Sequence, residues 1–237
     1  MPTTPLSRAL AVAALAVALG CAPARTEAQS ASAAAPERDA RAADATHLLN
    51  VAALSGQQVP VVPVGMVSTD PALLAASPAD SAAKAALAPW RDRRAAQLLA
   101  DSLVGDALEE RAPEVQWILP PRLRRVAKRA PGIVADPDRM GQAALRSPGL
   151  KTVPDPLASS LRNLVALTGG RLVLVPAAVA FAPDSAAGVR ATLALALADA
   201  RSTNVLWRSQ ASGAGATPAE ALRAALAAVL PSDSATP

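Results

Sequence analysis

The sequence predicts an α/β fold, in which a mixed sheet carries packed helices and ends in an antiparallel meander and a C-terminal helix. Apolar residues alternate along three consecutive segments, 171–183, 189–200 and 204–213, and the short turn sequences DSAAG and RST separate them. This arrangement is typical of antiparallel strands. Apolar residues follow helical spacing in 89–111 and 155–170. Helices therefore alternate with strands in the first half, which favours parallel pairing there.

Two short apolar, β-branched runs open the folded part, at 47–54 and 57–67, and Gly56 separates them. Both runs are predicted to be strands. Pro60 and Pro63 remove backbone donors, so the second run should lie at a sheet edge or be interrupted.

The helix over 89–111 is the clearest element of the chain. One predicted face holds Leu98, Leu99, Ser102, Leu103, Ala107 and Leu108, and the opposite, polar face holds Arg93, Asp101, Glu109 and Glu110. A shorter helix is expected to start at 77–80, a strand is expected at 114–119, and a basic helix at 121–131.

A long connection and two helices complete the predicted elements. Residues 131–156 are rich in Pro, Gly and Asp and should form a long loop with one turn. Gly169 or Gly170 should end the helix at 155–170. Thr217 and Glu220 form a capping box at the start of the last helix, which should bury Leu222, Leu226, Val229 and Leu230.

Composition excludes several kinds of site. The net charge of +4 is spread over many arginines, so nucleic acid is not an expected partner. The single cysteine excludes an internal disulfide and a thiolate zinc site, and the single histidine excludes a His-rich metal site. No phosphate loop, nucleophile elbow or dinucleotide fingerprint occurs. We therefore predict no catalytic residue, no metal and no cofactor.

The N-terminus predicts export. Residues 9–20 form an uncharged apolar run that is too short to span a bilayer and has the length of a signal-peptide core. The following VALGC resembles the bacterial lipoprotein signal, with cleavage between Gly20 and Cys21, although Ala18 and Leu19 depart from the usual residues. The alternative is ordinary cleavage after the sequence APA at 22–24.

The lipoprotein resemblance implies a diacylglycerol thioether on Cys21, usually with an acylated (often palmitoylated) amino group, and Ala22 implies sorting to the outer membrane. Two or more acyl chains hold a protein on a bilayer stably. The predicted organisation is a signal peptide at 1–20, a flexible tether at 21–45, a single α/β domain at 46–231 and a disordered tail at 232–237.

A family resemblance lies in the second half. The sequence DARSTNVLW at 199–207, with the strands before it and the helix after it, resembles the amino-terminal domain of TolB and the periplasmic domain of related curli-secretion lipoproteins. Asn204 stands where Gly is commoner, and Asn tolerates positive φ. The loop at 131–156 departs from that pattern. The resemblance implies a non-catalytic envelope domain that binds a partner.

Several residues are candidate sites. Arg122, Arg125 and Arg129 share helical spacing, so they form either a membrane-surface contact or a solvated face together with Arg124 and Lys128. Trp90 is expected either to contact a partner or to staple a helix start, whereas Trp117 and Trp207 should be core residues. His47 should be a surface residue, and SGAGA at 212–216 a flexible entry to the last helix.

The predicted function is that of an exported, lipid-anchored outer-membrane protein that faces the periplasm, has no catalytic activity and binds an unknown envelope protein. One alternative is a secreted hydrolase that uses Asp136, Asp138 and Asp155 of the long loop, although turn formation beside proline explains these residues as well. The other alternative is a small-molecule binder with the long loop as its lid.

Overall fold

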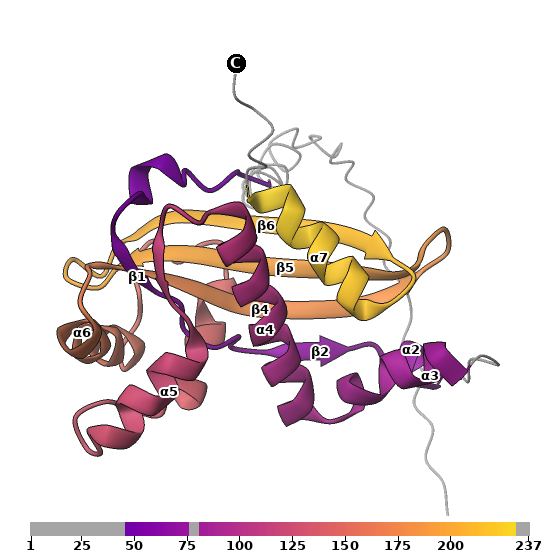
Figure 1. The fold of residues 1–237 in the computed structure, drawn as a ribbon, viewed down its shortest axis with the longest axis horizontal. Coiled ribbons are helices and arrows are strands. Elements are labelled where there is room, and N and C mark those ends of the chain that lie inside the picture. Colours follow the sequence, from indigo (N-terminus) through magenta and orange to yellow (C-terminus); the bar gives the residue numbers. More distant parts are fainter. Residues whose placement is uncertain (1–45, 76–80, 231–237) are drawn as a thin grey trace, which may run out of the picture.

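The main sheet has four strands in the order β2 (Val67–Thr69), β4 (Leu172–Asp184), β5 (Gly188–Asp199) and β6 (Val205–Gly215) (Figure 1). β2 is parallel to β4, and β4, β5 and β6 form an antiparallel meander. This computed structural model describes residues 46–75 and 81–230. The predicted mixed α/β fold is confirmed, whereas the predicted signal peptide, tether, tail and helix start at 77–80 lie outside the described residues.

The proline-containing run is interrupted, as predicted. β1 (Gln58–Pro60) pairs in parallel with β3 (Gln116–Ile118), and Val61 then bridges Leu174 of β4. The chain leaves regular pairing at Pro63, which has no N–H to donate, and resumes it at β2. The run therefore lies between β3 and β4 and does not form an outer edge.

The predicted strand at 47–54 is wrong. This segment contains only a 3-10 helix, η1 (Ala52–Leu54). Thr46 and His47 bond to Gln210 and Ser209 of the last strand, but Leu49 donates its N–H to the Val229 carbonyl at the end of the last helix, 2.9 Å away, so the segment turns away from the sheet. The apolar pattern instead reflects Leu49, Val51 and Leu54, which are buried.

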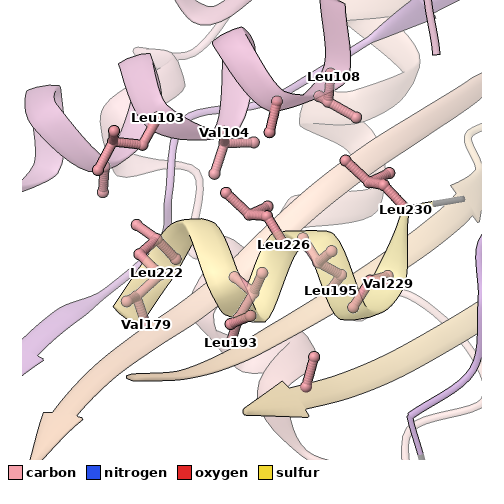
Figure 2. Packing of buried hydrophobic residues seen from close by; sticks show 14 of the residues in the cluster. Leu103, Val104, Leu108, Val179, Leu193, Leu195, Leu222, Leu226, Val229 and Leu230 are labelled. Carbon is pink, nitrogen blue, oxygen red and sulfur yellow. The ribbon is translucent and has the colours of Figure 1, made fainter. Parts of the chain in front are cut away.

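Two helices cover one face of the sheet. α4 (Arg93–Arg111) and α7 (Pro218–Val229) lie side by side (Figure 1). Figure 2 shows the core between them, where α4 and α7 side chains meet above β4 and β5 residues: Leu103, Val104, Leu108, Leu222, Leu226, Leu230, Val179, Leu193 and Leu195. α2 (Pro71–Ala75), α3 (Ser81–Leu87) and the 3-10 helix η2 (Ala88–Arg91) precede α4.

α4 starts later than predicted and is rotated. Asp92 caps it by accepting the Ala95 N–H at 2.7 Å. Leu98 and Ser102, expected to face the core, are exposed, whereas Asp101, expected on the polar face, is 4% exposed. Ala100 and Val104 take the core positions in their place. Apolar spacing alone missed this rotation because small alanines and a buried acid line the core side.

The opposite face of the sheet carries α6 (Leu157–Thr168) and the 3-10 helix η4 (Gln142–Arg146). α6 buries Leu157, Leu161 and Leu164 in the core on this face, and η4 buries Leu145 there. α5 (Pro120–Arg129) and the 3-10 helix η3 (Pro137–Arg139) lie between α4 and α6 along the chain. Residues 131–156 form a long loop as predicted, but it contains two 3-10 helices, η3 and η4, where one turn was predicted. The Arg208 guanidinium holds it by donating to the Leu150 carbonyl at 2.9 Å and to the Leu145 carbonyl.

A β-bulge interrupts β6, where the alternation of the sequence predicts that Val205 and Trp207 share one face. Leu197 pairs with Trp207 and Ala198 pairs with Val205, so Leu206 has no partner on β5. An extra residue reverses the alternation of the strand. Val205 therefore packs against the α6 side of the sheet, whereas Trp207 packs against the α4 and α7 side. The core position of Trp207 is confirmed, but the shared face is wrong.

The turn between β5 and β6 differs in one detail from the sequence prediction. The residue with left-handed backbone conformation is Thr203, with φ of 63°, and not Asn204. Asp199 organises this turn by accepting the N–H groups of Arg201 and Ser202 at 2.8 and 3.3 Å. Its other oxygen accepts the Arg171 Nε at 2.8 Å.

The C-terminal helix starts as predicted. Thr217 Oγ1 accepts the Glu220 N–H at 3.2 Å, and Glu220 accepts the Ala216 N–H at 3.0 Å. The glycines before it are not a flexible entry, because 212–215 belong to β6. A Cβ on Gly213 would lie 2.2 Å from the Ala225 nitrogen, so glycine allows α7 to approach the strand closely.

Candidate functional site

The predicted residues Gly20 and Cys21 lie outside the described residues, so lipidation stays a prediction. Arg122, Arg125 and Arg129 lie on α5 and are exposed, as is Lys128. None of these four cations forms an ion pair with a residue that the structure describes. They can therefore interact with an external anion.

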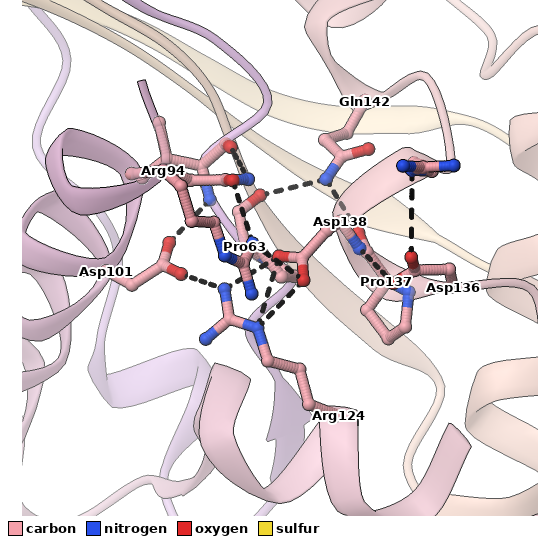
Figure 3. Close-up of polar contacts among 11 residues, drawn as sticks. Pro63, Arg94, Asp101, Arg124, Asp136, Pro137, Asp138 and Gln142 are labelled. Atoms are coloured by element: carbon pink, nitrogen blue, oxygen red, sulfur yellow. Dashed lines mark hydrogen bonds and ion pairs between the residues drawn. The ribbon is translucent and has the colours of Figure 1, made fainter. Parts of the chain in front are cut away.

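Arg124 differs from its neighbours because it points inward. Its Nη2 lies 2.7 Å from Asp138 Oδ1 and also contacts Asp101 Oδ2, and its Nε lies 3.1 Å from both Asp138 oxygens (Figure 3). Arg94 Nη1 approaches Asp138 Oδ2 at 2.9 Å. The expectation that Arg124 belongs to a solvated basic face is wrong.

The buried end of this network stabilises an irregular part of the backbone. Asp101 Oδ1 accepts the Val64 N–H at 2.7 Å, and Gln97 donates to the Val64 carbonyl at 2.9 Å. The two α4 side chains thus satisfy the backbone groups of a residue that follows Pro63 and has no strand partner. Sequence reasoning missed this role, because an acid inside a helical pattern gave no sign of burial.

The two acids respond to the network in opposite directions. Burial raises the pKa of Asp101, although the Val64 N–H and Arg124 oppose the rise. Burial also acts to raise the pKa of Asp138, but hydrogen bonds from Arg124 and Arg94 outweigh it and lower the value. Burial acts to lower the pKa of Arg124, yet Asp138 and Asp101 raise it overall.

A cavity of about 420 Å³ adjoins the network and is lined mainly by Arg94, Arg124, Lys128, Val134 and Asp138. Arg124 and both of its acid partners already satisfy one another there. The cluster connects α4, α5 and η3, and thereby fixes the orientation of α5. Its geometry indicates a structural role.

The hydrolase hypothesis required the three loop acids to converge, and the structure gives each a separate role. Asp138 is paired with Arg124 and Arg94. Asp136 caps η3 by accepting the Asp138 N–H at 3.1 Å, as expected for an acid beside proline. Asp155 contacts Ser159 and Arg162 at the start of α6. Among residues 46–75 and 81–230, no group of three His, Cys, Asp or Glu side chains is arranged to hold a metal ion.

The aromatic residues belong to the core. Trp90 is 3% exposed and its ring lies 4.6 Å from the Phe181 ring, centroid to centroid. The expectation that Trp90 contacts a partner is therefore wrong. Trp117 is half-buried and donates its indole N–H to the Ala112 carbonyl at 2.9 Å.

Two further features concern the surface. His47 is exposed, as predicted, and donates its backbone N–H to Ser209 Oγ at 2.9 Å. Within the described part of the chain, no helix has both the length and the apolar character needed to cross a bilayer.

Comparisons with known proteins identify no family for this chain. No protein-family model matches it, and the comparison with curated proteins gave no match. Among solved structures, the chain is similar to E. coli LpoB, determined by NMR, with 15% identity over 88% of this chain and 86% of that chain and a TM-score of 0.32. A likeness this weak does not define a function, and the TolB resemblance stays a prediction.

Proposed function

We propose that the protein is an exported lipoprotein of the bacterial envelope, non-catalytic, whose α/β domain binds another envelope component. The observation that carries the proposal is the uncharged apolar run at 9–20 followed by VALGC, which places the single cysteine at the lipidation position. Thioether and amide acylation would then hold the chain on the periplasmic side of the outer membrane.

The folded part supports a binding role. The acids that a hydrolase would use are engaged in ion pairs or helix caps. β6 is the outer strand of the sheet and pairs with β5 on one side. On its other side the Val205 N–H donates to the Lys151 carbonyl and the Gln210 carbonyl accepts the Thr46 hydroxyl, whereas beyond Gln210 no strand lies beside it among the described residues. An extended peptide can add to such an edge through backbone hydrogen bonds. The run around Pro60, which the sequence predicts to lie at an edge or be interrupted, offers no such edge, because β1 pairs with β3 and Val61 bridges Leu174 of β4.

Anchoring is tested by phase partition of envelopes from cells that express the full chain. The lipid-anchored protein enters the detergent phase of a cloud-point extraction, and the Cys21→Ser variant stays in the aqueous phase. Equal partition of both proteins would contradict the lipid anchor.

Partner binding is tested by crosslinking in intact envelopes. A photoreactive residue at Ser212 of β6 is compared with one at Ser185 in the β4–β5 turn, which is a matched exposed serine. A reproducible adduct from position 212 alone supports binding at the β6 edge. Absence of any adduct from several exposed positions would contradict a partner-binding role.

A further inference from the structure

We propose that the tip formed by α5 and the turn after it docks on an anionic bilayer, with the α5 cations on the headgroups and Ile133 inserted between them. This inference rests on the proposed function, because the lipid anchor brings the domain to a membrane. The occupant is a bilayer surface that is rich in acidic lipid.

The charge of this tip is of one sign. Residues 115–135 contain five basic residues and no acid, and the network at Asp101 and Asp138 neutralises only one of them, Arg124. The four that remain without an ion pair in the described structure are exposed: Arg122, Arg125, Lys128 and Arg129. Juxtaposed cations of this kind are attracted to acidic headgroups.

An apolar side chain stands at the end of the same helix. Ile133 is 59% exposed, and among the large apolar side chains of the described residues only Leu48, at 62%, is more exposed. α5 ends at Arg129, and Gly132, with φ of 83°, reverses the chain immediately before Ile133. Cations beside an exposed branched apolar residue form the combination that binds at a bilayer interface.

The exposure of Ile133 is fixed by its neighbours. Its N–H donates to the Ala130 carbonyl at 3.2 Å, and its carbonyl accepts the Asn163 side chain of α6 at 3.0 Å. The next residue, Val134, is buried in the core below α6. The backbone is therefore held on both sides while the Ile133 side chain points outward, so inserting it does not require the turn to be reordered.

Arg124 gives α5 its orientation. Because Arg124 is bonded to Asp101 of α4 and to Asp138, α5 cannot rotate to bury its other cations. The same ion pairs thus present Arg125 and Arg129 outward. This connects the buried network with the surface function.

The position of the tip is compatible with the proposed anchor. Thr46 bonds to the Gln210 carbonyl of β6, and Leu49 bonds to the Val229 carbonyl at the end of α7, whereas α5 lies at the opposite edge of the molecule from α7 (Figure 1). A domain of this length has a radius of gyration of about 16 Å. Residues 21–45, when fully extended, span about 80 Å. The preceding chain is therefore long enough for the tip to reach the bilayer that holds Cys21.

The test uses the full chain with Cys21→Ser, so that no acyl chain contributes, and a single environment-sensitive dye. The dye is attached at Ala135→Cys, an exposed position two residues from Ile133, or at Ser185→Cys at the far end of the sheet. Each protein is titrated with vesicles of phosphatidylglycerol and with vesicles of phosphatidylcholine.

We expect a blue shift of the dye at position 135 with phosphatidylglycerol alone, and none at position 185. Arg125→Glu with Arg129→Glu should weaken the partition at least 25-fold, at about fivefold for each neutralised cation. Ile133→Ser should weaken it about tenfold. The matched control, Arg201→Glu with Arg223→Glu, makes the same change in net charge away from the tip and should leave it unchanged.

Three results would overturn the inference: no shift at position 135, an equal shift with both lipids, or equal weakening by both charge-reversal pairs. If a soluble acidic polymer shifts the dye at position 135 more than vesicles do, the tip binds such a polymer in place of a bilayer. Because these proteins carry no lipid, failure here leaves the detergent-partition test of Cys21 as a separate result.

Discussion

Arg124 Nη2 lies 2.7 Å from Asp138 Oδ1, and the same nitrogen contacts Asp101, so one guanidinium joins α4, α5 and η3. Asp101 is 4% exposed and holds the Val64 backbone, which places a carboxylate inside the domain. A buried charge of this kind is tolerated when it is paired and hydrogen-bonded. The ion pair therefore stabilises both the interrupted strand and the position of α5.

Arg124→Met should destabilise the domain by about 3 kcal/mol, because it leaves Asp101 buried without a cation. The measurement is urea unfolding followed by tryptophan fluorescence. The neighbouring Arg125→Met is the matched control and should change the free energy of unfolding by less than about 0.5 kcal/mol, since Arg125 is exposed and has no ion pair among described residues. Equal effects of the two variants would contradict the role of Arg124.

The destabilisation caused by Arg124→Met should depend on pH. Burial raises the pKa of Asp101, so the folded state binds that proton more tightly than the unfolded state. This contribution is fully present below the unfolded pKa and is lost as pH rises through the folded pKa. Without Arg124 the pKa of Asp101 should rise further. Relative to the wild-type protein, Arg124→Met should therefore be less destabilised at pH 4, where Asp101 is more readily protonated, than at pH 7. A constant difference would mean that Asp101 does not carry the effect.

Asp199→Asn should cost about 2 kcal/mol at pH 7, because the carboxylate accepts hydrogen bonds from Arg171 and from two backbone N–H groups. The bonds from Arg171 keep the pKa of Asp199 well below its usual range, against the opposing effect of burial. Its stabilisation is therefore present above the unfolded pKa of about 3.9 and is lost as pH falls through the folded pKa.

The measurement is thermal unfolding of both proteins between pH 7 and pH 2. The wild-type protein should lose more stability than Asp199→Asn below about pH 4. Parallel curves for the two proteins would contradict the assignment. Asp138, whose pKa is also lowered, should keep an acid transition in the variant.

Thr203→Asn should stabilise the domain by about 1 kcal/mol. A β-branched residue with φ of 63° is strained, whereas asparagine adopts this conformation readily. Thr203 holds the turn through its backbone, which donates to the Asp199 carbonyl and accepts the Val153 N–H, and asparagine would keep both bonds. Calorimetry is the measurement, with Ser185→Asn in the exposed β4–β5 turn as the control, and a lower melting temperature for Thr203→Asn would contradict the strain.

Gly213→Ala should destabilise the domain by about 2 kcal/mol, because the new methyl group would press against the backbone of α7. Gly149→Ala is the control, since a Cβ there meets no atom within 4 Å. Denaturant midpoints of the two variants give the comparison. If Gly213→Ala were neutral, α7 could not lie as close to β6 as the structure has it.

The regular elements could be predicted from the sequence because their apolar periods are unbroken. Val189, Leu193, Leu195 and Leu197 alternate along β5 as expected, and α7 buries the four residues assigned to its core face. The order of parallel and antiparallel strands followed from the helices and turns between them.

The remaining features could not be predicted, because they depend on contacts between distant residues that the spacing of apolar residues does not indicate. The bulge at Leu206 moves Val205 and Trp207 to opposite faces, and no glycine, proline or asparagine at that position indicates it in the sequence. Asp101 looks like a surface acid until its partners Val64 and Arg124, far apart in sequence, come together in the fold. Likewise, the apolar spacing of 47–54 fits packing against the end of α7 as well as it fits a strand.

The central claim is that Cys21 carries the lipid that holds this domain in the envelope. The most direct measurement is the intact mass of the mature protein purified from a membrane fraction, beside the Cys21→Ser variant. We predict a chain that begins at Cys21 and carries the added mass of acyl chains, and a variant that is neither acylated nor retained on the membrane. A chain that begins at Arg25 or later without acyl mass, with both proteins soluble, would contradict the claim.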